Sequence, residues 1–416
     1  MKSRYGWKVP SEDVSLTHVE PGSPMGELMR RYWQPACLSE ELGDLPKRVR
    51  ILCEDLVLFR TKSGQVGCLE LHCSHRGTSL EWGRVEKDGL RCCYHGWLFD
   101  TAGRVLEMPC ETKEFCEKKT VEHPSYPTHE FGGLVFIYMG PPEKKPLFPM
   151  YDIYDTRHRK DVVLKGLRIW GDHSIGYVRD CNWLQHYENV MDPWHLLVLH
   201  QMISGDQFVG ALMQGKADIR FEQTPLGTRY NVVKDLPNGN RFDRYAECIL
   251  PNVYLVPNIQ EKGEHPKFED RCSEFSWVVP VDNEHIYGIS IVAWPLENGA
   301  PKKDWRPRTD TVLPIRPGAR REMPYEERQR KPDDMEAQEG QRAIAVHALE
   351  NLVPSDRGIG MLRRMLREQL KRIERGEDPI NIVRDEARNQ RITTNAWNTV
   401  LAPDQVKAKD TVPAGA

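Results

Sequence analysis

Cys73-Ser74-His75 opens the stretch that decides the fold of this chain, and Cys92-Cys93-Tyr94-His95 closes it. The stretch has the form C-x-H, a spacer over residues 76–91, and then C-x-x-H. Each half places one thiol and one imidazole on a tight turn, and two such turns can face each other. Two cysteines with two histidines are also a composition that binds zinc. The set of residues therefore indicates a metal site without naming its metal.

The order of the side chains favours one metal over the other. Cysteine precedes histidine in both halves, and this arrangement favours a two-iron, two-sulfur cluster. Two thiolates would then hold one iron and two imidazoles the other, which raises the reduction potential above that of an all-cysteine cluster. Structural zinc is the alternative. We expect the neighbouring Cys93 to be a packed thiol and not a further ligand.

The composition is that of a globular protein with two domains. The chain has 416 residues, of which 39% are hydrophobic and 29% are charged. A net charge of -3 gives no reason to expect nucleic acid as a partner. No apolar run approaches the roughly 18 residues that a membrane span needs, and no signal peptide is evident, so we expect a cytoplasmic protein with no membrane partner. The remaining cysteines lack a histidine at ligand spacing and are expected to be buried thiols: Cys37, Cys53, Cys68, Cys110, Cys116, Cys181, Cys248 and Cys272.

Three segments follow one another along the chain. Residues 1–45 predict an N-terminal arm with a short helix over residues 24–33. Residues 46–145 alternate β-rich runs with glycine-bearing turns and predict a small all-β domain. Residues 146–416 predict an α+β domain, with strand-like runs followed by a helical segment over about residues 333–375.

A second group of metal-binding side chain types lies near the middle of the chain. Asp192 and His195 are three residues apart, so they are neighbours on a helix. His195 and His200 are five apart, which turns them about 140° away from each other on a regular α-helix. Both can reach one metal only if the helix is irregular, and Pro193 supplies a cause. On spacing alone, the two histidines could equally be core or surface residues.

The residues around both groups resemble one family. His75-Arg76-Gly77 and His95-Gly96-Trp97 are similar to the Rieske domains of aromatic-ring-hydroxylating oxygenases. Residues 188–200 fit the pattern E-N-x-x-D-x-x-H-x-x-x-x-H of the α-subunits of these enzymes, position by position. The resemblance spans essentially the whole chain. It is strongest to the phthalate-dioxygenase branch, which includes aryl-ether O-demethylases such as dehydrodivanillate O-demethylase.

The resemblance implies an α+β fold with two iron centres. A small all-β Rieske [2Fe-2S] domain would be joined to a larger catalytic domain, in which a mixed or antiparallel sheet is flanked by helices (helix-grip type). The ligands of the [2Fe-2S] cluster would be Cys73, His75, Cys92 and His95. Mononuclear Fe(II) would be bound by a 2-His-1-carboxylate triad, formed by His195, His200 and Asp334. Asp333 is the alternative carboxylate, and an acidic helix start could also serve only to complement the helix dipole.

The resemblance also implies how the protein works. Asp192 would connect the cluster of one subunit to the iron of the next, within a homotrimer or a multiple of it. A flavin and iron–sulfur reductase, possibly with a ferredoxin, would supply electrons, and the chain itself has no G-x-G-x-x-G fingerprint for a dinucleotide.

The implied substrates are O2 and an aromatic carboxylic acid. We expect O-demethylation of a methoxylated, lignin-derived acid ahead of ring cis-dihydroxylation of a phthalate- or phenoxybenzoate-type acid. A Rieske electron carrier without oxygenase activity is the alternative from another class, and the second iron-binding set argues against it. An arginine could bind the substrate carboxylate, but the pattern does not choose among Arg220, Arg229, Arg241 and Arg244.

Overall fold

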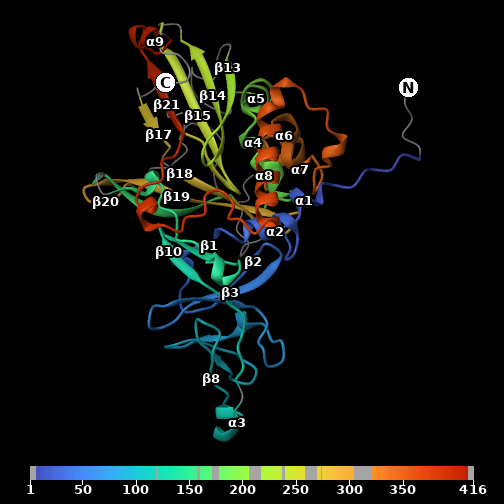
Figure 1. Cartoon of the computed structure of the whole chain (residues 1–416), viewed down its shortest axis with the longest axis vertical. Helices are drawn as coiled ribbons and strands as arrows, with labels where there is room; N and C mark the ends of the chain where they lie inside the picture. Colours follow the sequence, from blue (N-terminus) through green and yellow to red (C-terminus); the bar gives the residue numbers. More distant parts are fainter. Residues whose placement is uncertain are drawn as a thin grey trace.

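The molecule is elongated, as its computed structural model shows (Figure 1). The hairpin strand β8 (Val105–Glu107) and the helix α3 (Lys113–Lys118) lie at one end, and the helix α5 (Pro193–Leu197) lies towards the other. No helix among the described residues is long and apolar enough to cross a membrane. The structure describes residues 6–118, 120–156, 160–170, 178–205, 217–236, 239–257, 269–272, 274–303 and 321–410.

Two small antiparallel sheets build the end that carries the cysteine–histidine motif. One sheet has the order β2 (Lys47–Ile51), β3 (Glu54–Arg60), β4 (Val66–Glu70) and β9 (Ser125–Tyr126). The other has the order β5 (Arg84–Val85), β6 (Leu90–Arg91), β7 (Leu98–Phe99) and β8. Apolar side chains such as Val57, Phe59, Leu90 and Phe99 are fully buried between them. These short strands with tight turns confirm the expected all-β part.

A third small sheet links this end to the rest of the molecule. Its order is β1 (Trp33–Leu38), β11 (Leu134–Tyr138) and β10 (Thr128–Phe131). The helix expected over residues 24–33 is shorter, because α2 ends at Met29 and Trp33 already pairs with Tyr138. Aromatic residues have weak helix propensity, so strand pairing decides the structure here. The remaining short helix of the arm, α1, spans Val14–Thr17.

One large antiparallel sheet dominates the rest of the chain. Its strands follow the order β12 (Val162–Trp170), β19 (Ile286–Glu297), β18 (Glu274–Pro280), β16 (Val253–Leu255), β15 (Arg241–Ile249), β14 (Gly227–Asp235) and β13 (Asp218–Gln223). Three further strands branch from it: β17 (Glu269–Arg271), β20 (Ala300–Pro301) and β21 (Trp397–Leu401). The α+β fold with helices against a sheet is confirmed, and the strand pairs described are antiparallel.

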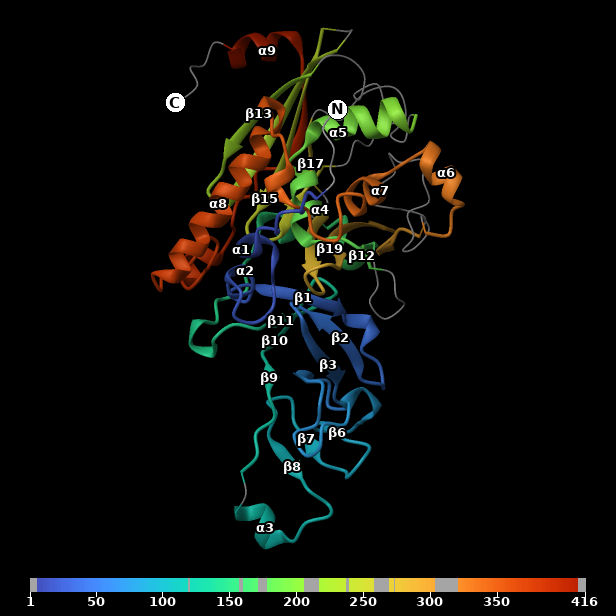
Figure 2. The same cartoon turned by 90° about the vertical axis from the view of Figure 1, so that its right-hand side faces the viewer.

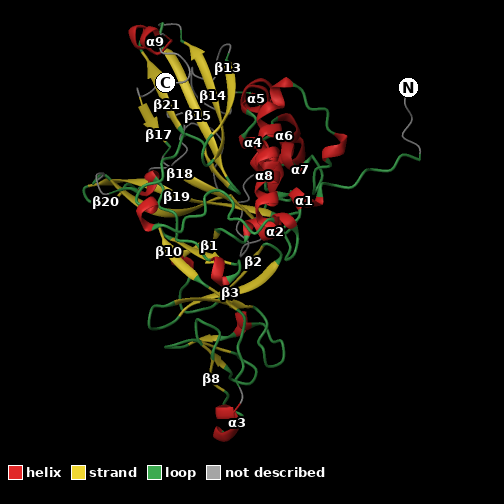
Figure 3. Ribbon diagram, viewed as in Figure 1, coloured by secondary structure: helices red, strands yellow, loops and turns green. Residues whose placement is uncertain are grey.

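Helices cover one face of the large sheet (Figure 3). Tyr187 on α4 (Trp183–Val190) donates its hydroxyl to the carbonyl of Ile249 on β15, at 2.8 Å. The helical segment expected over residues 333–375 is interrupted: α7 (Asp334–Glu339) and α8 (Arg357–Glu374) are separated by turns that include Pro354. Proline lacks the N–H that a continuing helix needs. Two more α-helices among the described residues are α6 (Tyr325–Arg330) and α9 (Pro403–Asp410).

One hydrophobic cluster joins the two ends, although the motif end also has a cluster of its own. The tight turn between β2 and β3 lies against the end of β18, where the amides of Leu52 and Cys53 donate to the carbonyls of Pro280 and Val281 at 2.9 and 3.0 Å. Buried side chains from both parts, such as Ile51 and Val278, belong to the same cluster. These contacts fix the two ends relative to each other within one chain. The turns with the cysteine–histidine motif are therefore held far from α5 (Figure 2).

Candidate iron centres

Two equivalent turns carry the cysteine–histidine motif. In each turn the cysteine carbonyl accepts from the glycine four residues later, Gly77 at 2.8 Å and Gly96 at 3.2 Å. Both glycines have positive φ, 74° and 73°, a conformation that other residues rarely adopt. The sequence forms these turns because each glycine lets the chain reverse just after its histidine.

The two turns point their metal-binding atoms toward each other. The rings of His75 and His95 lie 4.4 Å apart between centroids, and Trp97 stacks on His75 at 4.8 Å. Each histidine buries its Nδ1 atom without a hydrogen-bond partner. Cys73 and Cys92 are buried beside them as free thiols. Buried polar atoms normally have partners, so two inward-facing Nδ1 atoms beside two thiols fit a [2Fe-2S] cluster.

The other cysteines differ in how deeply they are buried. Cys93 is exposed, so the expectation that it is packed was wrong; the next residue of the turn, Tyr94, is exposed as well. Cys110 is also exposed, and Cys53 and Cys116 are partly buried. The prediction of buried thiols is confirmed for Cys37, Cys68, Cys181, Cys248 and Cys272.

The two histidines of the second candidate metal site lie where a regular α-helix is followed by a wider π-helix. Pro193 starts α5, and a π-helix, η6 (Val198–Ile203), follows it directly. In a π-helix the hydrogen bonds run from residue i to i+5, so residues five apart come close. The expected irregularity is therefore present, but its direct cause is the π-helix that contains His200, and Pro193 acts at the start of α5.

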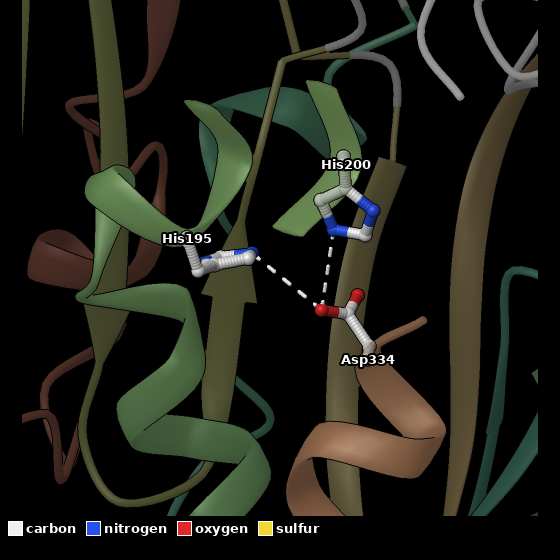
Figure 4. A group of neighbouring side chains, drawn as sticks. All are labelled: His195, His200 and Asp334. Carbon is white, nitrogen blue, oxygen red and sulfur yellow. Dashed lines mark ion pairs between the residues drawn. The ribbon is translucent and has the colours of Figure 1, made fainter. Parts of the chain in front are cut away.

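Three side chains converge at this point (Figure 4). Oδ1 of Asp334 lies 3.5 Å from Nε2 of His195 and 3.3 Å from Nε2 of His200. One potential ligand atom from each residue lies within 4.8 Å of the other two. His200 is buried, and His195 is partly buried. Two imidazoles and one carboxylate on one side of a site match the donor set of a mononuclear iron centre.

The two neighbouring aspartates have different surroundings. Asp333 caps α7, because its side chain accepts from the amide of Asp334 at 2.7 Å. Oδ1 of Asp334 lies near both histidines, whereas Oδ1 of Asp333 lies 3.7 Å from Nδ1 of His200. Burial alone would raise the pKa of Asp334, but the close approach of His200 and the charges of His195, His200 and Arg179 hold that pKa well below its ordinary value.

Asn189 also belongs to this site, although the sequence pattern gave it no role. Its Nδ2 donates to Oδ1 of Asp334 at 3.2 Å and lies 3.3 Å from Nε2 of His195. Gln338 links α7 to α4: its side chain lies 3.0 Å from His186, and its carbonyl accepts from Gln185 at 2.8 Å. These contacts hold the carboxylate of Asp334 in front of the two histidines.

Asp192 lies beside the triad on the half-exposed side. Its carboxylate accepts from the amide of Trp194 at 3.1 Å and so caps α5. Its carbonyl oxygen contacts Nδ1 of His195. A proton on Nδ1 leaves Nε2 of His195 as the atom with a lone pair, on the side of Asp334.

The paired turns and the triad define an iron–sulfur protein of the Rieske class with a second iron centre. The family model described as "Rieske [2Fe-2S] domain" matches residues 32–127. The chain is 39% identical over 379 residues to the phenoxybenzoate dioxygenase subunit alpha of Ectopseudomonas oleovorans, which covers 90% of this chain and 88% of that protein. The chain belongs to the family of Rieske oxygenase α-subunits.

The names of other relatives in the family describe different reactions. A tert-butanol monooxygenase / tert-amyl alcohol desaturase oxygenase subunit of Aquincola tertiaricarbonis is 38% identical, over 86% of this chain and 77% of its own length. The 5,5'-dehydrodivanillate O-demethylase oxygenase subunit of a Sphingobium species is 33% identical, over 92% and 85%. A crystal structure of dicamba monooxygenase has the same fold, with a TM-score of 0.57 at 17% identity over 84% of this chain and 99% of that one.

The protein is thus the terminal oxygenase component of a multicomponent system. It carries a Rieske [2Fe-2S] cluster and a mononuclear iron, and its work depends on a partner protein that supplies electrons. The alternatives of a structural zinc protein and of a simple electron carrier are excluded by this membership and by the second group of ligands.

Proposed function

We propose that the protein oxidises an aromatic carboxylic acid that carries an ether oxygen. Two relatives support this class, since phenoxybenzoate and the substrate of an O-demethylase both contain an aryl ether. O-demethylation of a methoxylated aromatic acid is the first candidate reaction. Ring cis-dihydroxylation is the second, and the 39% identity to phenoxybenzoate dioxygenase favours it. The observation that carries the proposal is the convergence of His195, His200 and Asp334 in a chain of this family.

The residues have distinct proposed roles. Cys73, His75, Cys92 and His95 would bind the cluster, and His195, His200 and Asp334 would bind the mononuclear iron. When bound by these residues, the iron would supply the site for O2 activation, and the cluster would supply the electrons. Asn189 would orient Asp334 through its hydrogen bond to Oδ1. The contact of His195 Nδ1 with the carbonyl of Asp192 would hold that ring in one orientation.

The active unit of the proposal is a homotrimer or a multiple of it. Within one chain, the elements that carry the two iron centres lie far apart (Figures 1 and 2), which supports electron transfer to a neighbouring subunit. Asp192 is only partly buried beside His195, so its carboxylate can be reached by a second chain. It would connect a cluster histidine of that chain to the iron site.

The electron donor of the proposal is a flavin and iron–sulfur reductase, with or without a ferredoxin. Such a reductase draws on NAD(P)H, and a cytoplasmic location would give access to it. The donor would deliver one electron at a time to the cluster.

Turnover tests the proposal directly. The holoenzyme is combined with a surrogate reductase and NADH, and is offered 3-phenoxybenzoate, phthalate and a methoxylated biaryl acid. Formaldehyde released in proportion to NADH would identify O-demethylation, and a cis-diol would identify dihydroxylation. Oxidation of tert-butanol with no product from any acid would contradict the proposed substrate class.

A further inference from the structure

The four arginines considered as carboxylate ligands have different environments in the large sheet. Three of them already have a carboxylate partner: Arg220 pairs with Asp218 at 2.7 Å, Arg229 with Glu222 at 2.6 Å, and Arg241 with Asp235 at 3.3 Å. Among the described side chains, Arg244 has no such ion pair. It is also the most deeply buried of the four.

Arg244 is a buried cation with unused hydrogen-bonding capacity. Its side chain lies on β15 and is only 5% exposed. Its Nε atom has no hydrogen-bond partner, and its Nη1 makes one long contact of 3.4 Å, to Oδ1 of Asn398. Burying a charge without a counter-ion is strongly unfavourable. A guanidinium in this position is therefore suited to bind an anionic ligand that is not part of the described chain.

A second cation lies on the same face of the sheet. In the antiparallel register Val232 stands opposite Arg244, and Lys234 stands opposite Phe242. Side chains two residues apart share a face, so Lys234 and Arg244 lie on one face of the β14–β15 pair. Lys234 is 4% exposed. Burial, and then the charge of Arg244, lower the pKa of Lys234 to about 8, so it is still mostly protonated at neutral pH.

This face of the sheet also contacts the helix that carries His195. Phe242 and its cross-strand partner Val400 form a buried cluster, and Leu196 and Leu197, the two residues that follow His195 on α5, pack against it. Phe242 and Arg244 are two residues apart on β15, a distance of about 7 Å along the strand. The two cations therefore lie on the part of the sheet that underlies the proposed iron site.

We propose that Arg244 and Lys234 form the subsite for the carboxylate of the substrate. The planar fork of an arginine binds both oxygens of a carboxylate, and a lysine adds a point charge. The apolar neighbours Val232 and Phe242 suit the aromatic part of the same molecule. The inference rests on the proposed function. A subsite of this kind would bind an aromatic acid in preference to a neutral alcohol such as tert-butanol.

Binding to the holoenzyme tests the subsite without turnover. Isothermal titration calorimetry compares 3-phenoxybenzoate with 3-phenoxybenzamide, a neutral analogue of similar shape. The unmodified protein should prefer the acid by about ten-fold or more, as expected for a charge-assisted pair. Arg244→Met should remove most of this preference, and Lys234→Met should reduce it. Arg244→Lys keeps the charge without the fork and should be intermediate.

Arg229→Met is the matched control. Arg229 lies on the neighbouring strand, at an odd position of β14, so it faces the opposite side of the sheet from Lys234, and it already pairs with Glu222. This variant should keep the full preference for the acid. Because Arg244 lacks an ion pair, Arg244→Met should also keep the midpoint of thermal unfolding.

The outcomes separate the subsite from the function. Equal affinity of the unmodified protein for the acid and the amide would overturn the subsite, and so would an unchanged preference in Arg244→Met. If that occurs while aromatic acids are still oxidised, the proposed function stands and the subsite fails. If the acid binds through Arg244 but yields no oxidised product with the reductase, the subsite stands and the proposed function fails.

Discussion

Arg363 on α8 donates Nε and Nη2 to the two carboxylate oxygens of Glu188 on α4, at 2.5 and 2.6 Å. Both side chains are buried, and Arg363 also binds Glu350. Glu188 directly precedes Asn189, which contacts Asp334 and His195. The ion pair thus ties the helix that supports the iron site to the longest helix of the described chain.

Replacing Arg363 by Met should strongly destabilise the protein. Glu188 would remain buried without its partner, and breaking a buried pair costs about 3–5 kcal/mol. Burial already raises the pKa of Glu188 to about 6, although Arg363 opposes this shift, so the loss of Arg363 should raise that pKa further. Glu188 in the folded variant then binds a proton more readily than it does in the unfolded chain. The loss in free energy of unfolding, relative to the unmodified protein, should therefore shrink as the pH falls from about 8 towards 6.

Urea unfolding at several pH values measures this effect. Arg364→Met is the control, because Arg364 is the next residue on α8 and is exposed. If the loss of stability in Arg363→Met does not change with pH, protonation of the buried Glu188 does not account for it.

Replacing Asp334 by Asn should remove the mononuclear iron and leave the cluster in place. The amide keeps the shape of the side chain but not the negative charge that a metal ligand supplies. Iron analysis should show the loss of one iron in three, with an unchanged visible spectrum of the cluster. Asp333→Asn is the control, because an amide can still cap α7; iron loss in that variant alone would make Asp333 the ligand.

Replacing Asp192 by Asn should leave both iron centres occupied and reduce turnover by about 100-fold or more, a loss typical of residues that support a metal ligand. The amide can still cap α5, so the helix should be retained. Steady-state turnover is compared with iron content and with the rate at which the reductase reduces the cluster. Asp218→Asn, an exposed position on β13, serves as the control. Normal turnover in Asp192→Asn would argue against the connection between subunits.

Affinity for an aromatic acid should fall as the pH rises through about 8. Lys234 loses its proton in this range because its pKa is lowered to about 8, while Arg244, the charged group that faces it, stays protonated. The bound carboxylate favours the protonated lysine, so in the complex the transition should lie above 8. The Kd of 3-phenoxybenzoate, which is ionised throughout, is measured between about pH 7 and 9.5. Lys234→Met should show a flat profile, and the same slope in that variant would assign the transition to another group.

Local sequence determined the cluster turns. Cysteine, histidine and a glycine with positive φ are close together in each half of the motif. The two turns, from Cys73 to Gly77 and from Cys92 to Gly96, could therefore be predicted from these short segments alone. The α+β class and the all-β part also followed from short-range patterns. Local preference was overridden where tertiary pairing was stronger, as at Trp33, which joins a strand and not the preceding helix.

Only the tertiary structure decided which distant residues meet. His200 and Asp334 are separated by more than a hundred residues, and their contact depends on a π-helix and on Gln338, which holds α7 against α4. Spacing could not choose among the four arginines, because the partner of each arginine is set by strand register and by the face of the sheet. A sequence fixes the chemistry that each segment can offer, whereas long-range packing fixes which of these groups share a site and which cation is left without a counter-ion.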